Sequence, residues 1–492
     1  MYMNINKFFL LTGVFMCTSF VFAQVKPLKQ SRPNVLFIVV DDLRPELGCY
    51  GKTQIKSPNI DRLAMSGIVF NNAFANYPVC GPSRASLLSG IYPSTKRFAI
   101  WNASQDKDAP GIVSLPMYFK NNNYQTVSLG KVYNNFEDGK GSWVKSWRPP
   151  VTNWDYQSKE SIRVFEERNK ERYKDKHVRD NNNLPQRGPA YEDPDIPDIS
   201  YEDGRIANRA VEELQNFSNS DEPFFLAVGF KKPHLPFNAP KKYWDLYKKK
   251  DFKLPPNYFF PKDAPDIARL NWAELRFFYG IPSSGPLPDT TAINLIHGYY
   301  ACVSYVDAQI GIVLNALEEL GLSENTIVVL LGDHGWFLGE HGFWTKQSNM
   351  EKGPHAPLIV KVPWKNGDVH TSALVEFVDI YPTLCELAGL SLPVHLQGKS
   401  LAPLLDDPSA PWKESIFYRA GTGETILTKT HAYTEWINNK TGQPYARMLY
   451  DHRTDPEENV NVADKPENQK LVEGLHEKLT RHLKARDSIF IP

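Results

Sequence analysis

The chain has 492 residues, of which 41% are hydrophobic, and its formal net charge is +0. This composition is typical of a globular protein and excludes an intrinsically disordered chain. The balanced charge also argues against a nucleic-acid partner, because a nucleic-acid-binding protein presents a basic face. The length suits one large α/β domain followed by a smaller one.

Residues 1–23 have the pattern of a secretory signal peptide. Lys7 supplies the positive charge, residues 8–22 form the apolar core, and Ala23 ends a small-residue cleavage site. A membrane anchor is the alternative, but polar and small residues interrupt an apolar stretch that is already short for a bilayer. We therefore expect a secreted or periplasmic protein with no transmembrane anchor.

Four cysteines follow this segment, which is too few for a disulfide scaffold in a secreted chain of this size. One disulfide among Cys49, Cys302 and Cys385 is compatible with the sequence. The pairing cannot be chosen from the sequence.

Residues 34–40 form an uninterrupted apolar run that ends in Asp41 and Asp42. Such a run is typical of a parallel strand that is buried on both faces. Ligands of open α/β sheets gather beyond the carboxyl ends of the strands. Two adjacent carboxylates repel each other unless a cation or protons intervene, so this pair favours metal ligation over a simple turn, where Asp is also common. Residues 57–66 then predict a helix capped by Ser57.

Residues 80–90 read Cys-Gly-Pro-Ser-Arg followed by Ala-Ser-Leu-Leu-Ser-Gly. The second part predicts a helix that begins at Ser83 or Ala85, with Cys80 one turn upstream. A helix N-terminus favours an anion, and Arg84 adds positive charge. We therefore expect a lowered thiol pKa at Cys80 and an anionic substrate. A buried structural cysteine is the alternative.

Three further apolar runs also end in polar residues. They are residues 126–130 before Lys131, residues 224–230 before the loop that contains His234, and residues 326–332 before Asp333 and His334. If these strands are central, the acids at the ends of two of them converge on one point with His334. Ca²⁺ suits several carboxylates, whereas a histidine is a less usual ligand for a hard ion, so Mg²⁺ and Mn²⁺ stay open.

Other segments contribute to the fold rather than to chemistry. Residues 297–320 repeat apolar side chains at helical spacing and predict a core helix. A last helix is expected to start at Asp464, with Glu467 completing a capping box. Residues 154–201 are polar and irregular apart from a short possible helix near residues 160–172, which suits either a specificity loop or a disordered insertion.

The segment at Cys80 resembles the signature of the type I sulfatases, and the other segments occur in that family's order. Residues 42–51 and 57–64 resemble the iduronate-2-sulfatase branch in particular. The resemblance implies an α/β fold of the alkaline-phosphatase type, with a mixed β-sheet sandwiched by helices. It places a catalytic domain at residues 32–390 and a smaller C-terminal α/β subdomain at residues 391–492.

The resemblance also implies a mechanism. A maturation enzyme would oxidise Cys80 to formylglycine, whose hydrated aldehyde is the nucleophile, with Arg84 beside it. Lys131 and Lys346 would grip the sulfate, and His234 would protonate the leaving oxygen. The implied ligands of one divalent ion, Ca²⁺ before Mg²⁺ or Mn²⁺, are Asp41, Asp42, Cys80, Asp333 and His334.

One position departs from the family pattern. Most members have a histidine shortly after the lysine at position 131, whereas this chain has Asn134 there. An asparagine can hydrogen-bond to a substrate but cannot act as a base. The implied substrate is a sulfated sugar of the glycosaminoglycan or ulvan type. The alternatives are a phosphomonoester or phosphonate hydrolase of the same superfamily and a carbohydrate-binding pseudoenzyme.

Overall fold

The computed structural model describes Met1 and residues 32–174, 187–269, 274–438 and 440–488. The expected signal peptide over residues 1–23 lies outside the described residues, apart from Met1. The expected boundary after residue 390 stays a prediction.

The core of the fold is a sheet of eight strands. From one edge to the other these are β10 (Val369–Glu376), β2 (Ile68–Phe74), β9 (Leu358–Lys361), β8 (Thr326–Gly332), β1 (Asn34–Val40), β6 (Phe224–Phe230), β3 (Gln125–Gly130) and β4 (Lys145–Trp147). β1 runs parallel to both of its neighbours, β8 and β6. β9 runs antiparallel to β8 and β2, so the sheet is mixed, as expected.

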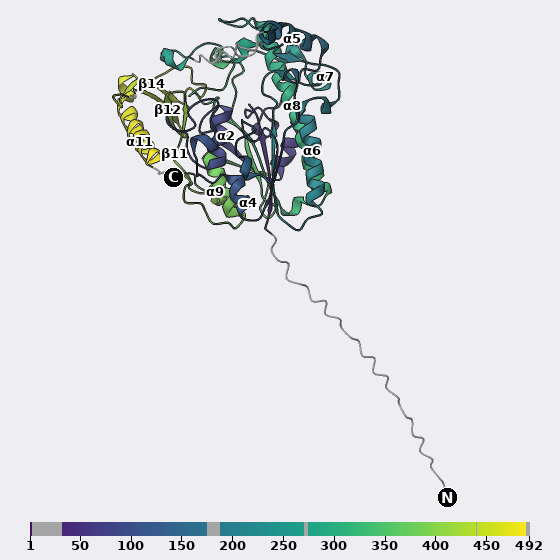
Figure 1. Ribbon diagram of the computed structural model, residues 1–492. Coiled ribbons are helices and arrows are strands. Elements are labelled where there is room, and N and C mark those ends of the chain that lie inside the picture. The colour runs from purple at the N-terminus through teal and green to yellow at the C-terminus, as the bar shows by residue number, and fades with distance from the viewer. Residues whose placement is uncertain (2–31, 175–186, 270–273, 439, 489–492) are drawn as a thin grey trace. The chain divides into compact units, whose positions relative to one another are not determined.

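Helices cover both faces of this sheet (Figure 1). On one face lie α1 (Pro58–Met65), α6 (Glu202–Phe217) and α8 (Asp289–Glu319); on the other lie α2 (Cys80–Ser89), α4 (Leu115–Asn121) and α9 (Ile380–Leu387). In β1, Leu36 and Ile38 pack toward the first group, and Phe37 and Val39 pack toward the second. Burial on both faces explains why this strand contains an unbroken apolar run.

α8 begins eight residues earlier than the sequence predicted, at Asp289. Among the described residues, it is the helix whose length and composition would suit a membrane span, but 83% of its most apolar part is buried inside the fold. This degree of burial is what a core helix requires, in agreement with the prediction for residues 297–320.

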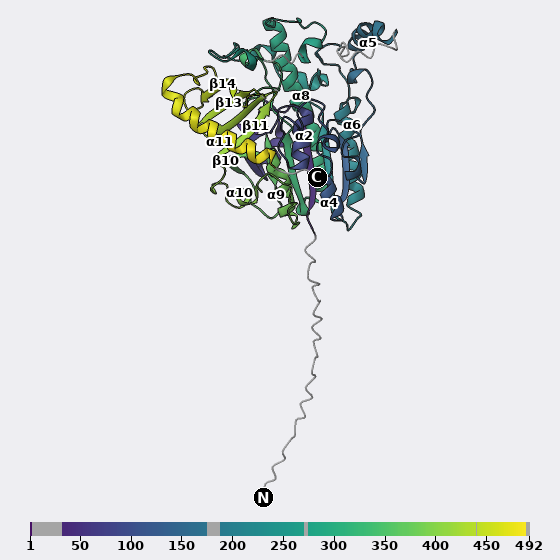
Figure 2. The same ribbon diagram turned by 60° about the vertical axis from the view of Figure 1, so that its left-hand side comes forward.

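A second sheet forms the C-terminal part of the chain. Its strands are antiparallel, in the order β11 (Ser415–Ala420), β12 (Gly423–Thr428), β13 (His431–Ile437) and β14 (Pro444–Asp451). α11 (Gln469–Asp487) lies across this sheet, as Figure 2 shows, and its Leu475 and Leu479 pack against Ile426 and Leu449. The expected smaller α/β unit is therefore present.

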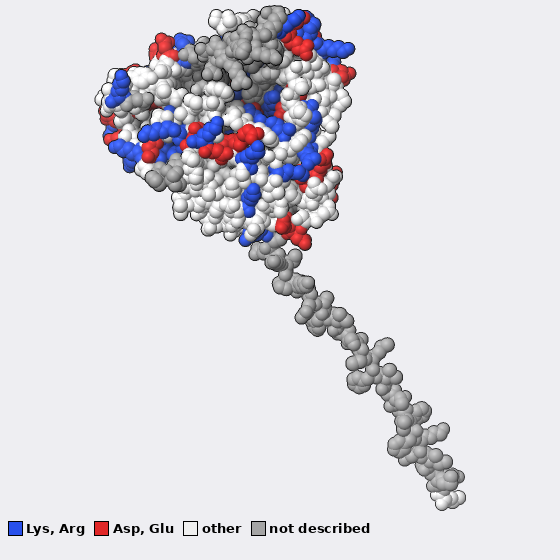
Figure 3. All heavy atoms as spheres, in the orientation of Figure 1, with Lys and Arg blue, Asp and Glu red and all other residues white. Residues whose placement is uncertain are grey.

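The remaining elements are short or peripheral. They are α3 (Gln105–Asp108), α5 (Lys159–Lys174), α7 (Lys241–Trp244), α10 (Ala402–Asp406) and the paired strands β5 (Tyr191–Glu192) and β7 (Phe237–Asn238). α5 confirms the helix expected near residues 160–172. On the face drawn in Figure 3, basic and acidic side chains are intermixed.

Two local predictions are wrong, and the structure decides one alternative that the sequence left open. α1 begins at Pro58 as expected, but the Ser57 hydroxyl does not cap it, because it accepts from the Gly48 N–H and contacts Asp61. α11 begins at Gln469 rather than at Asp464, and its N-cap, Asn468, makes no side-chain capping bond. All four described cysteines are free, so the disulfide left open for Cys49, Cys302 and Cys385 does not form.

Candidate functional site

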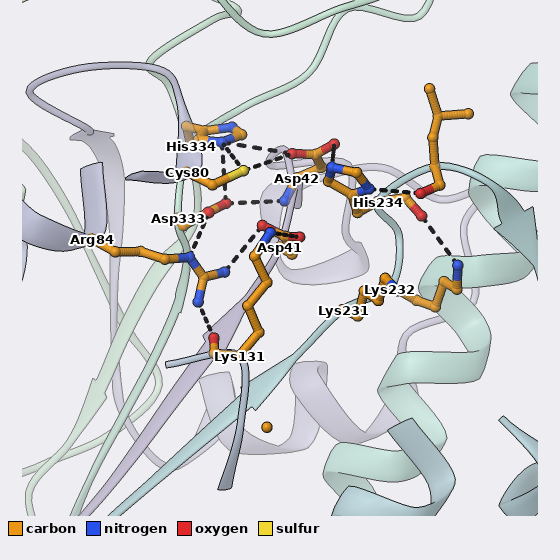
Figure 4. A network of polar contacts seen from close by, with 12 residues as sticks. Asp41, Asp42, Cys80, Arg84, Lys131, Lys231, Lys232, His234, Asp333 and His334 are labelled. Carbon is orange, nitrogen blue, oxygen red and sulfur yellow. Dashed lines mark hydrogen bonds and ion pairs between the residues drawn. The ribbon is translucent and has the colours of Figure 1, made fainter. Parts of the chain in front are cut away.

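The candidate site lies at the carboxyl ends of the central strands of the large sheet (Figure 4). Parallel neighbours end at the same edge of a sheet, so residues far apart in the sequence meet there. The residues that the sequence predicted and that meet at this edge are Asp41, Asp42, Cys80, Arg84, Lys131, His234, Asp333, His334 and Lys346.

Three aspartates form the centre of the site. Asp41, Asp42 and Asp333 are fully buried, and each offers a carboxylate oxygen within 4.8 Å of the others. Asp42 adopts a left-handed backbone conformation with φ 59°, and its N–H donates to Asp333 Oδ1 at 3.0 Å. Three buried carboxylates at such distances require compensating positive charge.

Arg84 supplies part of that charge from the first turns of α2. Its Nε donates to Asp333 Oδ2 at 2.8 Å, and its Nη2 donates to Asp41 Oδ1 at 3.1 Å. Its Nη1 donates to the carbonyl oxygens of Lys131 and Val132. Arg84 therefore holds β1, β8 and the end of β3 together at the site.

Two lysines supply the rest. Lys131 Nζ donates to Asp41 Oδ2 at 2.6 Å, and Lys346 Nζ donates to Asp42 Oδ1 at 3.0 Å. Lys346 also lies over the ring of Trp336, with its Nζ 5.1 Å from the ring centroid. Both ammonium groups therefore lie at the aspartates that surround Cys80, where an anion would find two point charges.

The two adjacent aspartates differ in proton affinity. Burial raises the pKa of Asp42 to about 7, and the Lys346 ammonium only partly opposes this effect. At Asp41, burial acts in the same direction, but Lys131, His234 and Arg84 hold the pKa well below its usual range. Asp41 is therefore ionised at neutral pH, while Asp42 holds a proton loosely enough for a cation to displace it.

Cys80 is the first residue of α2, so the expectation that it lies one turn upstream of the helix is wrong. Its Sγ is 3.3 Å from His334 Nε2 and 4.0 Å from Asp42 Oδ1. Burial raises the thiol pKa well above its ordinary value, and the Asp41 carboxylate adds to this effect. The expectation of a lowered thiol pKa is therefore wrong, and the unmodified thiol is a poor nucleophile here.

The donor set fits a divalent cation. Besides the three aspartates, the side chains of Asp42, Cys80 and His334 form a second group whose ligand atoms lie within 4.8 Å of one another. His334 Nδ1 contacts the Gly335 carbonyl oxygen at 3.0 Å, which leaves Nε2 directed at the cluster. A ring nitrogen fixed by a backbone carbonyl is the usual arrangement of a histidine that binds a metal through its other nitrogen.

His234 lies on the loop that follows β6. Its Nδ1 contacts the Leu235 carbonyl oxygen at 2.7 Å, so Nε2 is the nitrogen that faces the site. Burial lowers the pKa of His234, Lys346 lowers it further, and Glu274 raises it. Glu274 Oε1 lies 3.3 Å from His234 Nε2 and therefore favours the protonated ring.

Glu274 is a site residue that the sequence did not indicate. Its second oxygen lies 3.1 Å from Lys346 Nζ, and Arg187 Nη1 lies 3.3 Å from its first oxygen. Glu274 thus links two of the predicted functional groups, His234 and Lys346. It is the first residue of a short 3-10 helix, Glu274–Phe277, that no pattern in the sequence indicated.

Asn134 is the one predicted residue that the structure does not bring into contact with the cluster. It is half-buried on the loop after β3, three positions beyond Lys131. No hydrogen bond or ion pair to the site residues is recorded for it within the described part of the chain. Its proposed contact with substrate stays a prediction.

The comparisons with known proteins agree with this geometry. The family model described as Sulfatase matches residues 33–390, and the model described as N-sulphoglucosamine sulphohydrolase, C-terminal, matches residues 339–485. The chain is 36% identical to iduronate 2-sulfatase of Mus musculus over an alignment of 397 residues. The alignment covers 73% of this chain and 69% of the relative. It is 27% identical over 490 residues to an ulvan-active sulfatase of Formosa agariphila, covering 94% and 83%.

A solved structure also resembles this fold. It is that of a protein in complex with its substrate D-glucosamine-2-N,6-O-disulfate, and it matches with a TM-score of 0.71 at 23% identity over 93% of this chain and 98% of the other. The likeness shows the alkaline-phosphatase-like fold of mixed sheet and flanking helices. Together with the match to the family model over most of the chain, the relatives establish that the protein belongs to the sulfatase family, in its iduronate-2-sulfatase-like branch, and is a sulfuric ester hydrolase.

Proposed function

We propose that this protein releases sulfate from sugar units of a sulfated polysaccharide or oligosaccharide, with the residue at position 80 as the nucleophile. The observation that carries the proposal is the position of Cys80 among three buried aspartates, two of which accept hydrogen bonds from Lys131 and Lys346. A site of this kind suits an anionic group that is attacked by a nearby nucleophile.

Two groups complete the site. Asp41, Asp42, Asp333 and His334, with residue 80, would hold one divalent ion, for which three carboxylates favour Ca²⁺ over Mg²⁺ or Mn²⁺. The ion would supply positive charge for the sulfuryl oxygens. Conversion of Cys80 to formylglycine by a maturation enzyme would supply a hydrated aldehyde, with one hydroxyl for attack on sulfur and a second for release of the sulfate. The raised pKa of the Cys80 thiol argues against the unmodified thiol as the nucleophile.

The side chains of this protein position the reacting groups. Lys131 and Lys346 bind the sulfate oxygens, and Arg84 pairs with Asp41 and Asp333 beside them. The electrostatic attraction of fixed ammonium groups strengthens as charge develops on these oxygens. This arrangement requires no movement of the sheet.

His234 delivers the proton to the leaving oxygen. Its Nδ1 is engaged by the Leu235 carbonyl, so a proton on Nε2 is directed at the site, and Glu274 stabilises that proton. A sugar alkoxide is a poor leaving group without protonation. Asn134 would contact the sugar rather than replace a base.

The substrate class follows from the relatives. One relative is named iduronate 2-sulfatase, and another is named ulvan-active sulfatase. We propose a substrate of this type, and a secreted or periplasmic location in accordance with the signal-like residues 1–23.

Mass spectrometry of the peptide that contains Cys80 tests the mechanism, together with sulfate release from sulfated oligosaccharides. We expect formylglycine at position 80 in active enzyme and no activity in Cys80→Ala, whereas Cys49→Ala retains activity as a matched control. Fully active enzyme with an unmodified thiol would refute the mechanism. Faster cleavage of a phosphate ester than of the matching sulfate ester would favour the phosphohydrolase alternative, and binding without release would favour a pseudoenzyme.

A further inference from the structure

A second cluster of histidines and carboxylates lies outside the candidate site. Glu351 and His355 precede β9 of the large sheet, whereas His452 and Glu458 follow β14 of the C-terminal sheet. Glu351, His452 and Glu458 each offer a ligand atom within 4.8 Å of the others. His355 Nδ1 lies 3.4 Å from the remaining oxygen of Glu351. The cluster therefore joins the two sheets.

If both histidines are neutral, their ring N–H groups are too few to form a hydrogen bond at every contact with Glu351 and Glu458. His355 Nε2 lies 2.8 Å from the Asn71 carbonyl oxygen, which can only accept, so the neutral ring directs the lone pair of Nδ1 at Glu351. His452 has carboxylate oxygens at both nitrogens, Glu458 at 3.1 Å and Glu351 at 3.4 Å, but a neutral imidazole has one N–H. The cluster needs two additional protons or one divalent cation.

The distances favour a cation. Within the group of three, the contact between Glu351 Oε2 and His452 Nδ1 measures 3.4 Å, which is longer than a good N–H···O bond. Ligands that bind one zinc ion tetrahedrally at about 2.0–2.1 Å lie about 3.3–3.4 Å apart. The Asn71 carbonyl oxygen orients the His355 ring, and the Glu351 backbone N–H donates to Glu458 Oε2 at 2.8 Å. Metal-binding side chains usually have such additional hydrogen bonds, which hold them in place.

The surroundings also suit an ion. A cavity of about 810 Å³ lies beside the cluster and is lined by Glu351, His355 and Glu458, among others, which provides a path from solvent. The neighbouring cation, Lys352, pairs with Glu457 at 2.9 Å rather than with either cluster carboxylate. Two carboxylates at the cluster therefore have no cation between them other than the histidines.

We propose that Glu351, His452 and Glu458, supported by His355, bind a divalent transition metal ion of the zinc type, separate from the catalytic ion. Imidazole nitrogens select such ions over Ca²⁺. The ion links the segment before β9 to the turn after β14 and thereby fixes the C-terminal sheet against the catalytic sheet. This inference does not depend on the function proposed for the site at Cys80.

Metal analysis of the mature full chain tests the proposal. After dialysis against excess Ca²⁺ and a small excess of ZnCl₂, we expect one zinc ion per chain in the wild type and none in the double variant His355→Gln/His452→Gln. We expect zinc affinity to fall by at least about 100-fold in that variant. His370→Gln is the matched control, because His370 lines the same cavity without belonging to the cluster, and it should retain zinc.

A cobalt titration tests the proposal on the wild type alone and therefore does not require the double variant to fold. Co²⁺ added to the Ca²⁺-loaded wild type should give the visible absorption of a nitrogen- and oxygen-coordinated ion, which equimolar Zn²⁺ removes. Absence of this absorption, or equal zinc content in the wild type and a folded double variant, would overturn the proposal. The two histidines would then be held as imidazolium ions between the glutamates.

Discussion

Replacing Arg84 with methionine tests how the aspartate cluster is stabilised. Arg84 forms ion pairs with Asp41 and Asp333, and all three side chains are fully buried. Methionine keeps much of the volume but removes the charge and leaves both carboxylates without their partner. Breaking a buried pair by removing one member costs about 3–5 kcal/mol. Because a whole domain is stable by only about 5–15 kcal/mol, this loss is a large share of the total.

The assay is guanidinium unfolding followed by tryptophan fluorescence, in EDTA and in Ca²⁺. Arg453→Met is the control, because Arg453 forms a solvent-exposed pair with Asp451, which should be worth at most about 1 kcal/mol. The loss for Arg84→Met should be smaller in Ca²⁺, since an ion held by the same aspartates would supply the missing charge. An unfolding midpoint for Arg84→Met equal to that of the control in EDTA would contradict this account of the cluster.

Three further predictions concern charge. Burial alone would raise the pKa of Glu340, but the Arg44 guanidinium at 2.9 Å lowers this pKa to about 2 from an ordinary 4.5. The pair should therefore add about 3 kcal/mol to the free energy of unfolding. This contribution is present above pH 4.5 and is lost as the pH falls toward 2. Unfolding curves of wild type and Glu340→Gln should therefore converge on acidification, and parallel curves would contradict the assignment. Lys346→Met should lower kcat/KM for a sulfate ester by about 10²–10³-fold, whereas an unchanged value would remove Lys346 from the sulfate site. EDTA should abolish sulfate release and Ca²⁺ should restore it, and activity that resists exhaustive chelation would exclude the ion.

The elements with a periodic or unbroken apolar pattern were predictable. β1, β6 and β8 are apolar throughout because both of their faces are buried, and the polar residues that follow them had to meet at one edge of the sheet. This topology is why the acids at the ends of β1 and β8 could be placed together from the sequence.

Helix starts depended on information that the sequence patterns lacked. The sequence predicted that α2 begins at Ser83 or Ala85, but it begins at Cys80 and has Pro82 in its first turn, where the N–H groups have no intrahelical partner and proline costs little. Near the C-terminus, Pro466 holds Lys465 in an extended conformation, with ψ 133°, and this delays α11. The second example shows that a capping pattern is overridden by a proline two positions later.

The electrostatics of the site could not be predicted because they depend on distances. Arg84, four residues after Cys80, suggested an activated thiol. Its guanidinium is instead directed at Asp41 and Asp333, and burial is the largest influence on the pKa of Cys80. Glu274 reaches the site from a short 3-10 helix, Glu274–Phe277, whose position no local sequence pattern determines. The sequence thus indicated which side chains meet at the site, but not which of the charged side chains form pairs there.

Glu274 gives the charge balance of the site a testable consequence. With the protonated His234 included, the site and its immediate partner Arg187 contain four carboxylates and five cations, so a divalent ion leaves it with three positive charges for the substrate and the nucleophile. A sulfate monoester carries one negative charge and a phosphate monoester at neutral pH carries about two. Glu274→Gln removes one negative charge and should therefore favour phosphate over sulfate by about thirtyfold, because one extra unit charge at roughly 8 Å contributes about 2 kcal/mol at an effective dielectric constant near 20. The ratio of kcat/KM for matched phosphate and sulfate aryl esters measures this change independently of any general loss of activity, and a ratio that stays constant or falls would show that Glu274 acts on His234 alone.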